Sequence, residues 1–299
     1  LNLKDIRNTR IGAIKDSWRI MRRLRARRYD IMVLLQPVRF LSTLLRMALF
    51  SYTVNAKKVV GRSKKGRAFF LHMAVPEDGK HEVERNLEIA KLLGAEVKVS
   101  QPKINISQQD KLQAQRFLKE KGVREEDILI GVHPGAYRPS RQWPKERFAG
   151  LIDVLQNYPA RIVITGSAKE KSMIADIVKR QKREVILSVD REVGELAALI
   201  DMFDIFITND TGPMHLAMTL APFVVAIFGP GEIKRIGPYG DKERFRIVKK
   251  KVPCSPCYKY SCTRHVCMKA IKIGDVFRAV NEGIRLTYWR RRRRWLNLA

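Results

Sequence analysis

From residue 128 onward, short apolar runs alternate with amphipathic stretches of helical spacing. The runs that read as strands are ILIGVHPG (128–135), RIVITGS (161–167), EVILSV (184–189), DIFITND (204–210) and FVVAIFGP (223–230). The stretches of helical spacing between them cover residues 145–157, 169–181, 193–203 and 213–220. This alternation predicts an α/β fold with a parallel, doubly wound sheet buried on both faces. In such a fold, ligands bind at the carboxyl ends of the strands.

The first hundred residues show a similar but incomplete pattern. YDIMVLL (29–35) and AKKVVG (56–61) read as strands, EVKVS (96–100) as a strand or edge segment, and HEVERNLEIAKLLGA (81–95) as a helix. Three strands are few for a doubly wound domain, so the N-terminal domain is predicted to be truncated. The predicted organisation is an N-terminal domain over 1–106, a linker helix with N-cap Ser107 over 107–124, a C-terminal domain over 125–275, and a C-terminal helix with a basic tail over 276–299.

The charge balance points to polyanionic partners. Among 299 residues, 59 Lys and Arg against 30 Asp and Glu give a formal net charge of +29, which attracts nucleic acid, anionic bilayers or phosphorylated small molecules. No window offers the ~18 uninterrupted apolar residues of a transmembrane helix. In the tail YWRRRRRW (288–295), Trp289 and Trp295 lie close to five arginines, Arg290 to Arg294. That pattern predicts an anchor on an anionic membrane surface, and RNA stays the alternative ligand of the tail.

Two predicted strand exits carry residues that suit a nucleotide. In GVHPGAYRPSRQWPKERFAGL (131–151), a strand ends at His133 and a basic loop holds Arg138 and Arg141. This is either an ordinary β–α loop with Trp143 as its packing anchor or a loop in which Arg141 binds a diphosphate. In ITGSAKEK (164–171), Glu170 can accept ribose hydroxyls only if it faces the same cleft.

The third exit is the turn Asn209-Asp210-Thr211-Gly212, which precedes the predicted helix 213–220. Asp210 is either an N-cap or a ligand contact, and His215 is either a structural imidazole or part of the site. The backbone N–H groups at a helix start favour bound anions. Three such exits along one sheet predict a shared site for a phosphate-bearing ligand.

The segments HPGAYRPSRQWP, ITGSAKEK, ELAALIDMFDIFITNDTGPMHLA and FGPG resemble the C-terminal half of glycosyltransferase family 9, the bacterial lipopolysaccharide heptosyltransferases of GT-B fold. The resemblance covers about residues 128–275 and, more loosely, LRARRYDIMVLLQP and HEVERNLEIAKLLGA. It implies two Rossmann-like doubly wound domains facing a cleft, the N-terminal one incomplete and on the acceptor side. It also implies that the C-terminal domain holds an ADP-sugar and that catalysis requires no cofactor.

The resemblance assigns roles to individual residues. Arg141 takes the position, two residues before the Trp, at which a basic residue, usually Lys, contacts the diphosphate. Glu170 matches the acidic residue that contacts the ribose, and the Asp-Thr-Gly segment matches residues that contact phosphate and sugar. The predicted donor-binding residues are His133, Arg141, Glu170, Asp210, Thr211, Gly212 and His215.

The same resemblance implies a general base in a Gly-Asp loop after an N-terminal strand. The sequence shows no such segment, so we expect the base upstream of Leu1. Asp5 and Asp16 lie in a basic, predicted helical segment and are not nominated. The catalytic residues are therefore unassigned.

The four cysteines cluster in CSPCYKYSCTRHVC, at Cys254, Cys257, Cys262 and Cys267. This spacing permits a structural zinc site, four reduced packing thiols or a local disulfide. A catalytic thiol is not expected, because glycosyl transfer to a hydroxyl needs none.

These observations together predict a glycosyltransferase that moves heptose, or a related sugar, from an ADP-heptose-like donor to a lipid-linked lipopolysaccharide core acceptor. The expected location is the cytoplasm, on the inner face of the inner membrane. The alternatives are a non-catalytic sugar-nucleotide binder and a basic nucleic-acid-binding protein, although nucleic acid is not expected as a partner.

Overall fold

The computed structural model describes residues 10–36, 41–63, 68–97 and 102–296. The chain divides into two compact units, residues 1–99 and residues 100–299. Each unit has its own parallel sheet. In the described residues, no helix is both long enough and apolar enough to cross a bilayer.

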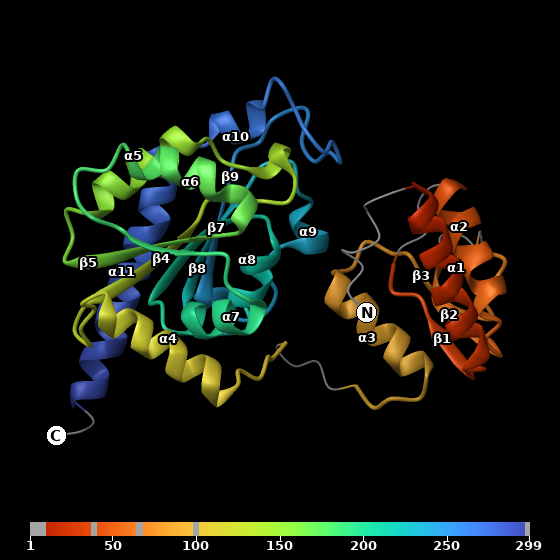
Figure 1. The fold of residues 1–299 in the computed structure, drawn as a ribbon. Helices are drawn as coiled ribbons and strands as arrows, with labels where there is room; N and C mark the ends of the chain where they lie inside the picture. Colours follow the sequence, from red (N-terminus) through yellow and green to blue (C-terminus); the bar gives the residue numbers. More distant parts are fainter. Residues whose placement is uncertain (1–9, 37–40, 64–67, 98–101, 297–299) are drawn as a thin grey trace. The chain divides into compact units, whose positions relative to one another are not determined.

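The C-terminal unit contains a six-stranded parallel sheet in the order β6-β5-β4-β7-β8-β9 (Figure 1). The strands are β4 (Ile128–His133), β5 (Ala160–Gly166), β6 (Ile186–Val189), β7 (Ile205–Asn209), β8 (Phe223–Phe228) and β9 (Phe245–Lys249). All residues of β7 and β8 are buried, as continuous apolar runs in a two-faced parallel sheet should be. The doubly wound sheet predicted from the sequence is confirmed.

Helices cover both faces of this sheet. One face is covered by α5 (Lys145–Leu155), α6 (Lys171–Val178) and α11 (Ile273–Leu296), and the other by α4 (Gln108–Glu120), α7 (Val193–Asp201) and α8 (Gly212–Ala217). The shorter helical segments are η2 (Pro139–Arg141), η3 (Ala168–Glu170), α9 (Ile233–Ile236), η4 (Lys242–Arg244) and α10 (Val266–Ala270). The predicted N-cap Ser107 is confirmed, since its hydroxyl accepts from the N–H of Asp110 at 3.1 Å.

The strand order places a topological switch between β4 and β7. From β4 the chain proceeds to β5 and β6 on one side, then returns to β7 on the other side of β4. The loops that leave β4 and β7 therefore run in opposite directions, and in open α/β sheets a crevice is expected at the carboxyl ends of two such strands. The crevice is where an α/β sheet of this kind binds its ligand.

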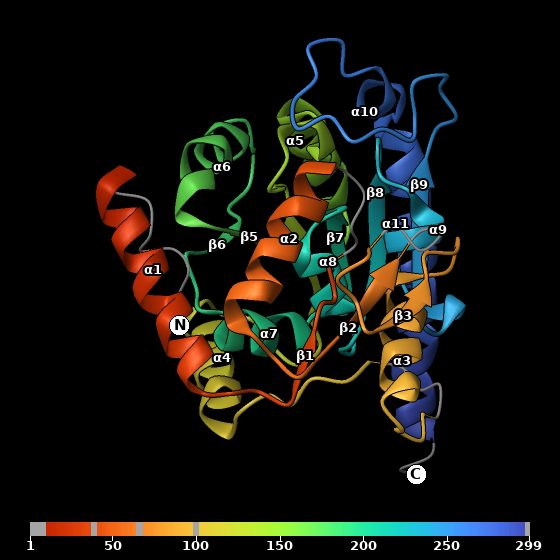
Figure 2. The ribbon, with the colours of Figure 1, turned by 90° about the vertical axis from the view of Figure 1, so that its right-hand side faces the viewer.

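The N-terminal unit has a three-stranded parallel sheet in the order β1-β2-β3 (Figure 2). Its elements are α1 (Arg10–Ala26), β1 (Ile31–Val33), α2 (Leu41–Val54), β2 (Lys58–Ser63), β3 (Met73–Pro76) and α3 (Glu82–Leu92). Its largest cluster of fully buried apolar residues comprises Val60, Val75 and Ile89. This core is small compared with the two clusters that flank the six-stranded sheet.

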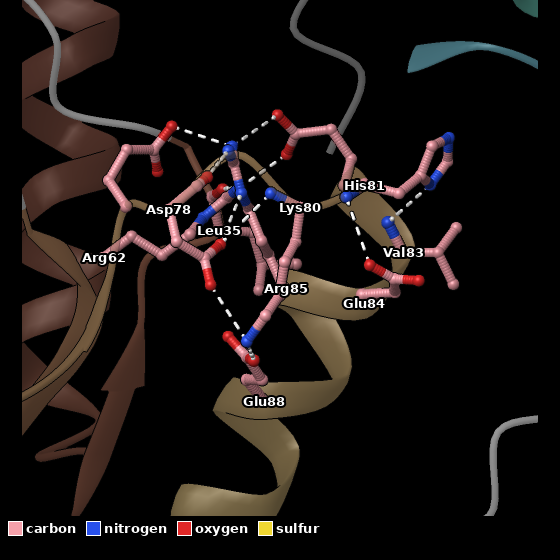
Figure 3. A network of polar contacts seen from close by, with 11 residues as sticks. Leu35, Arg62, Asp78, Lys80, His81, Val83, Glu84, Arg85 and Glu88 are labelled. Carbon is pink, nitrogen blue, oxygen red and sulfur yellow. Dashed lines mark hydrogen bonds and ion pairs between the residues drawn. The ribbon is translucent and has the colours of Figure 1, made fainter. Parts of the chain in front are cut away.

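Buried charge supplements this small core. Arg62, on β2, donates to Glu82 at 2.6 Å and also to the carbonyl of Leu35. Arg85, on α3, donates to Glu77 at 2.8 Å and to the carbonyl of Asp78 at 2.6 Å. Both arginines are buried, and Figure 3 shows their network around the start of α3. The network connects β2 and the start of α3 to the segments that follow β1 and β3.

Three sequence predictions need correction. The third strand of the N-terminal unit is Met73–Pro76, whereas Glu96 and Val97 have no regular structure and the rest of 96–100 lies outside the described residues. The helix predicted over 213–220 is only Gly212–Ala217. Strand β9 was not predicted, because Arg246 and Lys249 leave it only a short apolar run. The side chains from residue 288 onward, including Arg290 to Arg294, lie outside the described residues.

Candidate functional site

Asn209 joins the two loops that border the crevice. It ends β7 and is completely buried. Its side-chain oxygen accepts from the N–H of Trp143 at 3.0 Å, and its side-chain nitrogen donates to the carbonyls of Pro134 at 2.8 Å and Gly135 at 3.2 Å. All three partners belong to the segment between β4 and α5. One amide therefore fixes the basic loop relative to the Asp-Thr-Gly turn.

Arg141 and Asp210 meet at the sheet edge where β4 and β7 end. Arg141 Nη1 lies 3.1 Å from Asp210 Oδ1 and 3.5 Å from the Asp210 carbonyl oxygen. Asp210 is 1% exposed, and neither of its carboxylate oxygens accepts a well-aligned hydrogen bond. The two side chains thus form an ion pair, and the carboxylate oxygens of Asp210 accept no well-aligned hydrogen bond from it.

Further cations surround this pair. Burial raises the pKa of Asp210 to about 6, although Arg141, Arg138 and Lys249 act in the opposite direction. Burial also lowers the pKa of Arg141, and repulsion from Arg138 and Arg235 adds to that effect. Three cationic side chains therefore act on one carboxylate, an excess of positive charge that favours a bound polyanion.

Gly231, in the loop after β8, is required by the position of Asp210. A Cβ atom on Gly231 would lie 2.2 Å from Asp210 Oδ2. The Gly231 carbonyl accepts from Lys249 Nζ at 3.0 Å. The backbone of the loop after β8 thus lies against the Asp210 carboxylate, and its Gly231 carbonyl binds the Lys249 ammonium group.

Glu170 lies against the β4 exit from the opposite side. Ser167 donates to Glu170 Oε2 through its N–H at 2.7 Å and its hydroxyl at 2.8 Å. A Cβ atom on Gly135 would lie 1.8 Å from Glu170 Oε1, so this contact depends on glycine. Glu170 therefore borders the loop that carries Arg141.

The remaining predicted residues occupy different environments. His133 is buried, its Nδ1 lies 3.0 Å from Thr165 Oγ1, and burial lowers its pKa despite the opposing charge of Glu170. Thr211 is half-buried at the start of α8, while Gly212 and His215 are exposed. The structure thus brings Arg141 and Asp210 into contact, with Glu170 at the neighbouring strand exit.

Sequence reasoning missed a clamp that the cysteine-rich segment places on the basic loop. Ser140 donates to the carbonyls of Tyr260 at 3.1 Å and Lys259 at 2.7 Å, and its own carbonyl accepts from His265 Nε2 at 3.1 Å. Arg138 Nη1 donates to the Tyr258 carbonyl at 3.2 Å. The segment 258–265 therefore helps to position Arg138 and Arg141, which precede and follow Ser140 in the basic loop.

The four cysteines are free thiols. In the described part of the chain, no three His, Cys, Asp or Glu side chains are grouped so that they could hold a metal ion. Burial raises the pKa of the Cys267 thiol, and the other three cysteines add to this shift. The structure therefore gives no support to the predicted zinc site or to the disulfide alternative.

Comparison with known proteins agrees with this geometry. The family model described as glycosyltransferase family 9 (heptosyltransferase) matches residues 17–267. The chain belongs to glycosyltransferase family 9. Lipooligosaccharide heptosyltransferase 2 of Campylobacter jejuni is 32% identical over 151 residues, which cover 48% of this chain and 47% of that protein. This family 9 chain spans about half the length of the first curated relatives it matches.

Two solved structures show that the fold is GT-B. A family 9 glycosyl transferase from Veillonella parvula matches with a TM-score of 0.72 at 23% identity, covering 93% of this chain and 80% of that one. The E. coli heptosyltransferase WaaC with ADP matches with a TM-score of 0.64 at 18% identity, covering 91% of this chain and 78% of that one. The fold class predicted from the sequence is confirmed.

Proposed function

We propose that this family 9 chain transfers a heptosyl group, or a related sugar, from an ADP-linked donor to a lipid-linked saccharide of the lipopolysaccharide core. The observation that carries the proposal is the buried Asp210–Arg141 pair within an excess of cations, at the switch point of a parallel sheet. Its support from outside the chain is that a heptosyltransferase of the same fold was solved with ADP.

In this proposal, residues at neighbouring strand exits bind different parts of the donor. Glu170, at the β5 exit, accepts the ribose hydroxyls. Arg141, together with Arg138 and Lys249, binds the diphosphate. Asp210, Thr211, Gly212 and His215 contact the phosphate and the transferred sugar.

The chemistry follows from this arrangement. When the bond from the anomeric carbon to the diphosphate breaks, negative charge develops on the leaving group. Cations that are already in position stabilise that charge without reorganisation. The cationic cluster would thus do what a divalent metal does in other transferases, so the proposal requires no cofactor.

Donor binding is the direct test. At 100 times its dissociation constant, ADP should stabilise the protein by roughly 2.7 kcal/mol if only the native state binds, which thermal unfolding detects. Arg141→Ala and Asp210→Ala should remove most of the rise in melting temperature. Arg116→Ala, which removes an exposed arginine on α4, is the matched control and should keep it. An unchanged rise in both site variants would refute the assignment.

The membrane is the second proposed partner, through the tail residues 290–294. Each arginine near an anionic leaflet contributes on the order of 1 kcal/mol. The protein should therefore co-sediment with anionic vesicles, and replacing the five arginines by glutamine should weaken this. Equal sedimentation of the two proteins, or much tighter binding of the tail to RNA at physiological salt, would reject the anchor. This membrane contact would place the enzyme at the cytoplasmic face, beside a lipid-linked acceptor.

A further inference from the structure

His265 adopts a backbone conformation that is unusual for a residue with a side chain. It lies directly before α10, with φ 50° and ψ 31°, which is the left-handed region. In that region a Cβ atom crowds the neighbouring carbonyl oxygen, so glycine occupies it with less strain. Residues held in strained conformations cluster at functional sites. The imidazole of His265 is therefore expected to make a contact that glycine could not.

That contact is with the peptide unit that joins Ser140 to Arg141. His265 Nε2 lies 3.1 Å from the Ser140 carbonyl oxygen, and because a carbonyl only accepts, this ring nitrogen donates. At the other side of the same peptide unit, the N–H of Arg141 donates to the Arg138 carbonyl at 2.9 Å. Because a peptide unit is planar, the two hydrogen bonds fix its orientation. The imidazole thus holds one side of the unit from which the Arg141 side chain begins.

His265 is attached to a buried part of the chain. Helix α10 follows it directly, and Cys267 and Met268 in this helix are buried. The carbonyl of Ile271, just after α10, accepts from Trp143 Nε1 at 3.0 Å. His265 therefore connects the hydrophobic core to the basic loop.

The other contacts of the clamp come from an exposed segment. Residues 258–260 accept hydrogen bonds from Arg138 and Ser140 through their backbone carbonyls, and all three are exposed. A segment without buried side chains opens locally at a low free energy. His265 differs from them, because the helix that follows it is fixed in the core. Its hydrogen bond is therefore the part of the clamp that the core supports.

A fixed peptide unit before Arg141 favours the binding of a diphosphate. The Arg141 side chain starts from this unit and ends with Nη1 3.1 Å from Asp210 Oδ1. If the backbone could rotate, ordering it together with a long side chain would oppose binding, because conformational freedom would be lost on association. A hydrogen bond made before the ligand arrives removes that cost from the binding step.

We propose that His265 is a positioning residue for the donor: through the peptide unit between Ser140 and Arg141, it holds Arg141 where the diphosphate binds. His265 itself touches no part of the donor. The inference rests on the proposed function, because it requires that Arg141 binds the diphosphate. It adds a residue outside the nucleotide site that sets the affinity for the donor.

The test compares the affinity for ADP, measured by calorimetry on the full chain, with the melting temperature of each protein without ligand. His265→Ala removes the imidazole and keeps the strained backbone, whereas His265→Gly removes both. His265→Gln retains a donor, because the amide nitrogen of glutamine lies about as far along the side chain as Nε2 of histidine. Asn55→Gly, at an exposed left-handed residue with φ 55°, is the matched control.

His265→Ala and His265→Gly should both bind ADP about tenfold more weakly, the equivalent of one hydrogen bond. His265→Gly should nevertheless melt at a higher temperature than His265→Ala, because it relieves the backbone strain. His265→Gln should stay within about threefold of the wild-type affinity, and Asn55→Gly should not change it. Unchanged affinity in the alanine and glycine variants would overturn the proposal. So would affinities that follow the melting temperatures, since they would indicate a purely structural role.

A double-mutant cycle with Arg141→Met shows whether the effect passes through Arg141. Adding His265→Gly to Arg141→Met should weaken ADP binding by less than about twofold, since the side chain to be positioned is already absent. Two losses that multiply would overturn the proposal. A wild-type chain that does not bind ADP would refute the donor assignment and this inference together, whereas ADP binding that is insensitive to His265 would refute the inference alone.

Discussion

Arg141 Nη1 lies 3.1 Å from Asp210 Oδ1, yet neither carboxylate oxygen of Asp210 receives a well-aligned hydrogen bond. A buried carboxylate without donors is costly, and it is retained here beside a guanidinium that reaches it through one nitrogen.

The positive charge at position 141 should matter more than the guanidinium fork, because the observed contact with Asp210 uses only Nη1. Arg141→Lys should keep the affinity for ADP within about threefold. Arg141→Met should lower it by about ten- to a hundredfold, the equivalent of one charge-assisted hydrogen bond. Isothermal calorimetry with ADP checks this, and equal losses in the two variants would contradict it.

Asp210 should make stability fall as pH rises from about 4 to about 6. The folded-state pKa is about 6 against a reference value of 3.8. Between these values the folded state binds the extra proton, so raising the pH favours the unfolded state. Relative to Asp210→Asn, the wild type should lose on the order of 3 kcal/mol across this window, at about 1.4 kcal/mol per pKa unit. Urea titrations at several pH values measure this, and parallel profiles would refute it.

Asn209→Ala should destabilise the C-terminal unit and release the basic loop. The change leaves the N–H of Trp143 and the carbonyls of Pro134 and Gly135 without their side-chain partner, and a buried unpaired group costs about 1–3 kcal/mol. The free energy of unfolding should fall by roughly 3 kcal/mol or more. Asn157→Ala, at an exposed position, should change it by less than about 0.5 kcal/mol. If Asn209→Ala also lowered the free energy of unfolding by less than about 0.5 kcal/mol, the amide would not hold the loop.

Gly135→Ala should weaken ADP binding through Glu170. The added methyl group would lie 1.8 Å from Glu170 Oε1, so the carboxylate must move. If Glu170 contacts the ribose, affinity for ADP should fall while affinity for pyrophosphate stays the same. Gly274→Ala, where nothing lies within 4 Å of the added atom, is the control. Equal losses for ADP and pyrophosphate would mean that the substitution disturbs the whole loop.

Arg85→Ala should unfold the N-terminal unit selectively. Removing the guanidinium leaves Glu77 and the Asp78 carbonyl without this donor, and breaking a buried ion pair costs about 3–5 kcal/mol. The small core of this unit offers little to offset that loss. Hydrogen exchange should therefore rise in residues 41–97 and stay unchanged in residues 128–249. Lys80→Ala, at a half-exposed ion pair, should cost less than about 1 kcal/mol.

The strand exits were predictable because their signals are local. An apolar run that ends in a polar or glycine turn before a helix identifies a β–α loop, and parallel strands place all such loops at one edge. Arg141, Glu170 and Asp210 could therefore be selected from the sequence. The resemblance to family 9 added their expected order along the donor.

The contacts that position these residues were not predictable, because they join segments far apart in the chain. Asn209 was recognised as part of a turn, but nothing local shows that its amide binds the backbone near Trp143. The clamp between Ser140 and His265 spans 125 residues. Strand β3 was missed because its apolar run, Met73–Pro76, is short and ends in proline. Burial of Arg62 and Arg85 also depends on tertiary partners that have no periodic signature.

Helix α11 completes the core on one face of the six-stranded sheet, where Val276, Val280 and Ile284 join Leu151 and Phe223 in a single cluster. Ribosomal synthesis delivers all six strands before this helix. Until about residue 284 has emerged, the part of this face that α11 covers stays exposed in the nascent chain, and exposed apolar surface of this kind aggregates or recruits chaperones. The C-terminal unit is therefore expected to acquire its stable form only after helix α11 has left the exit tunnel.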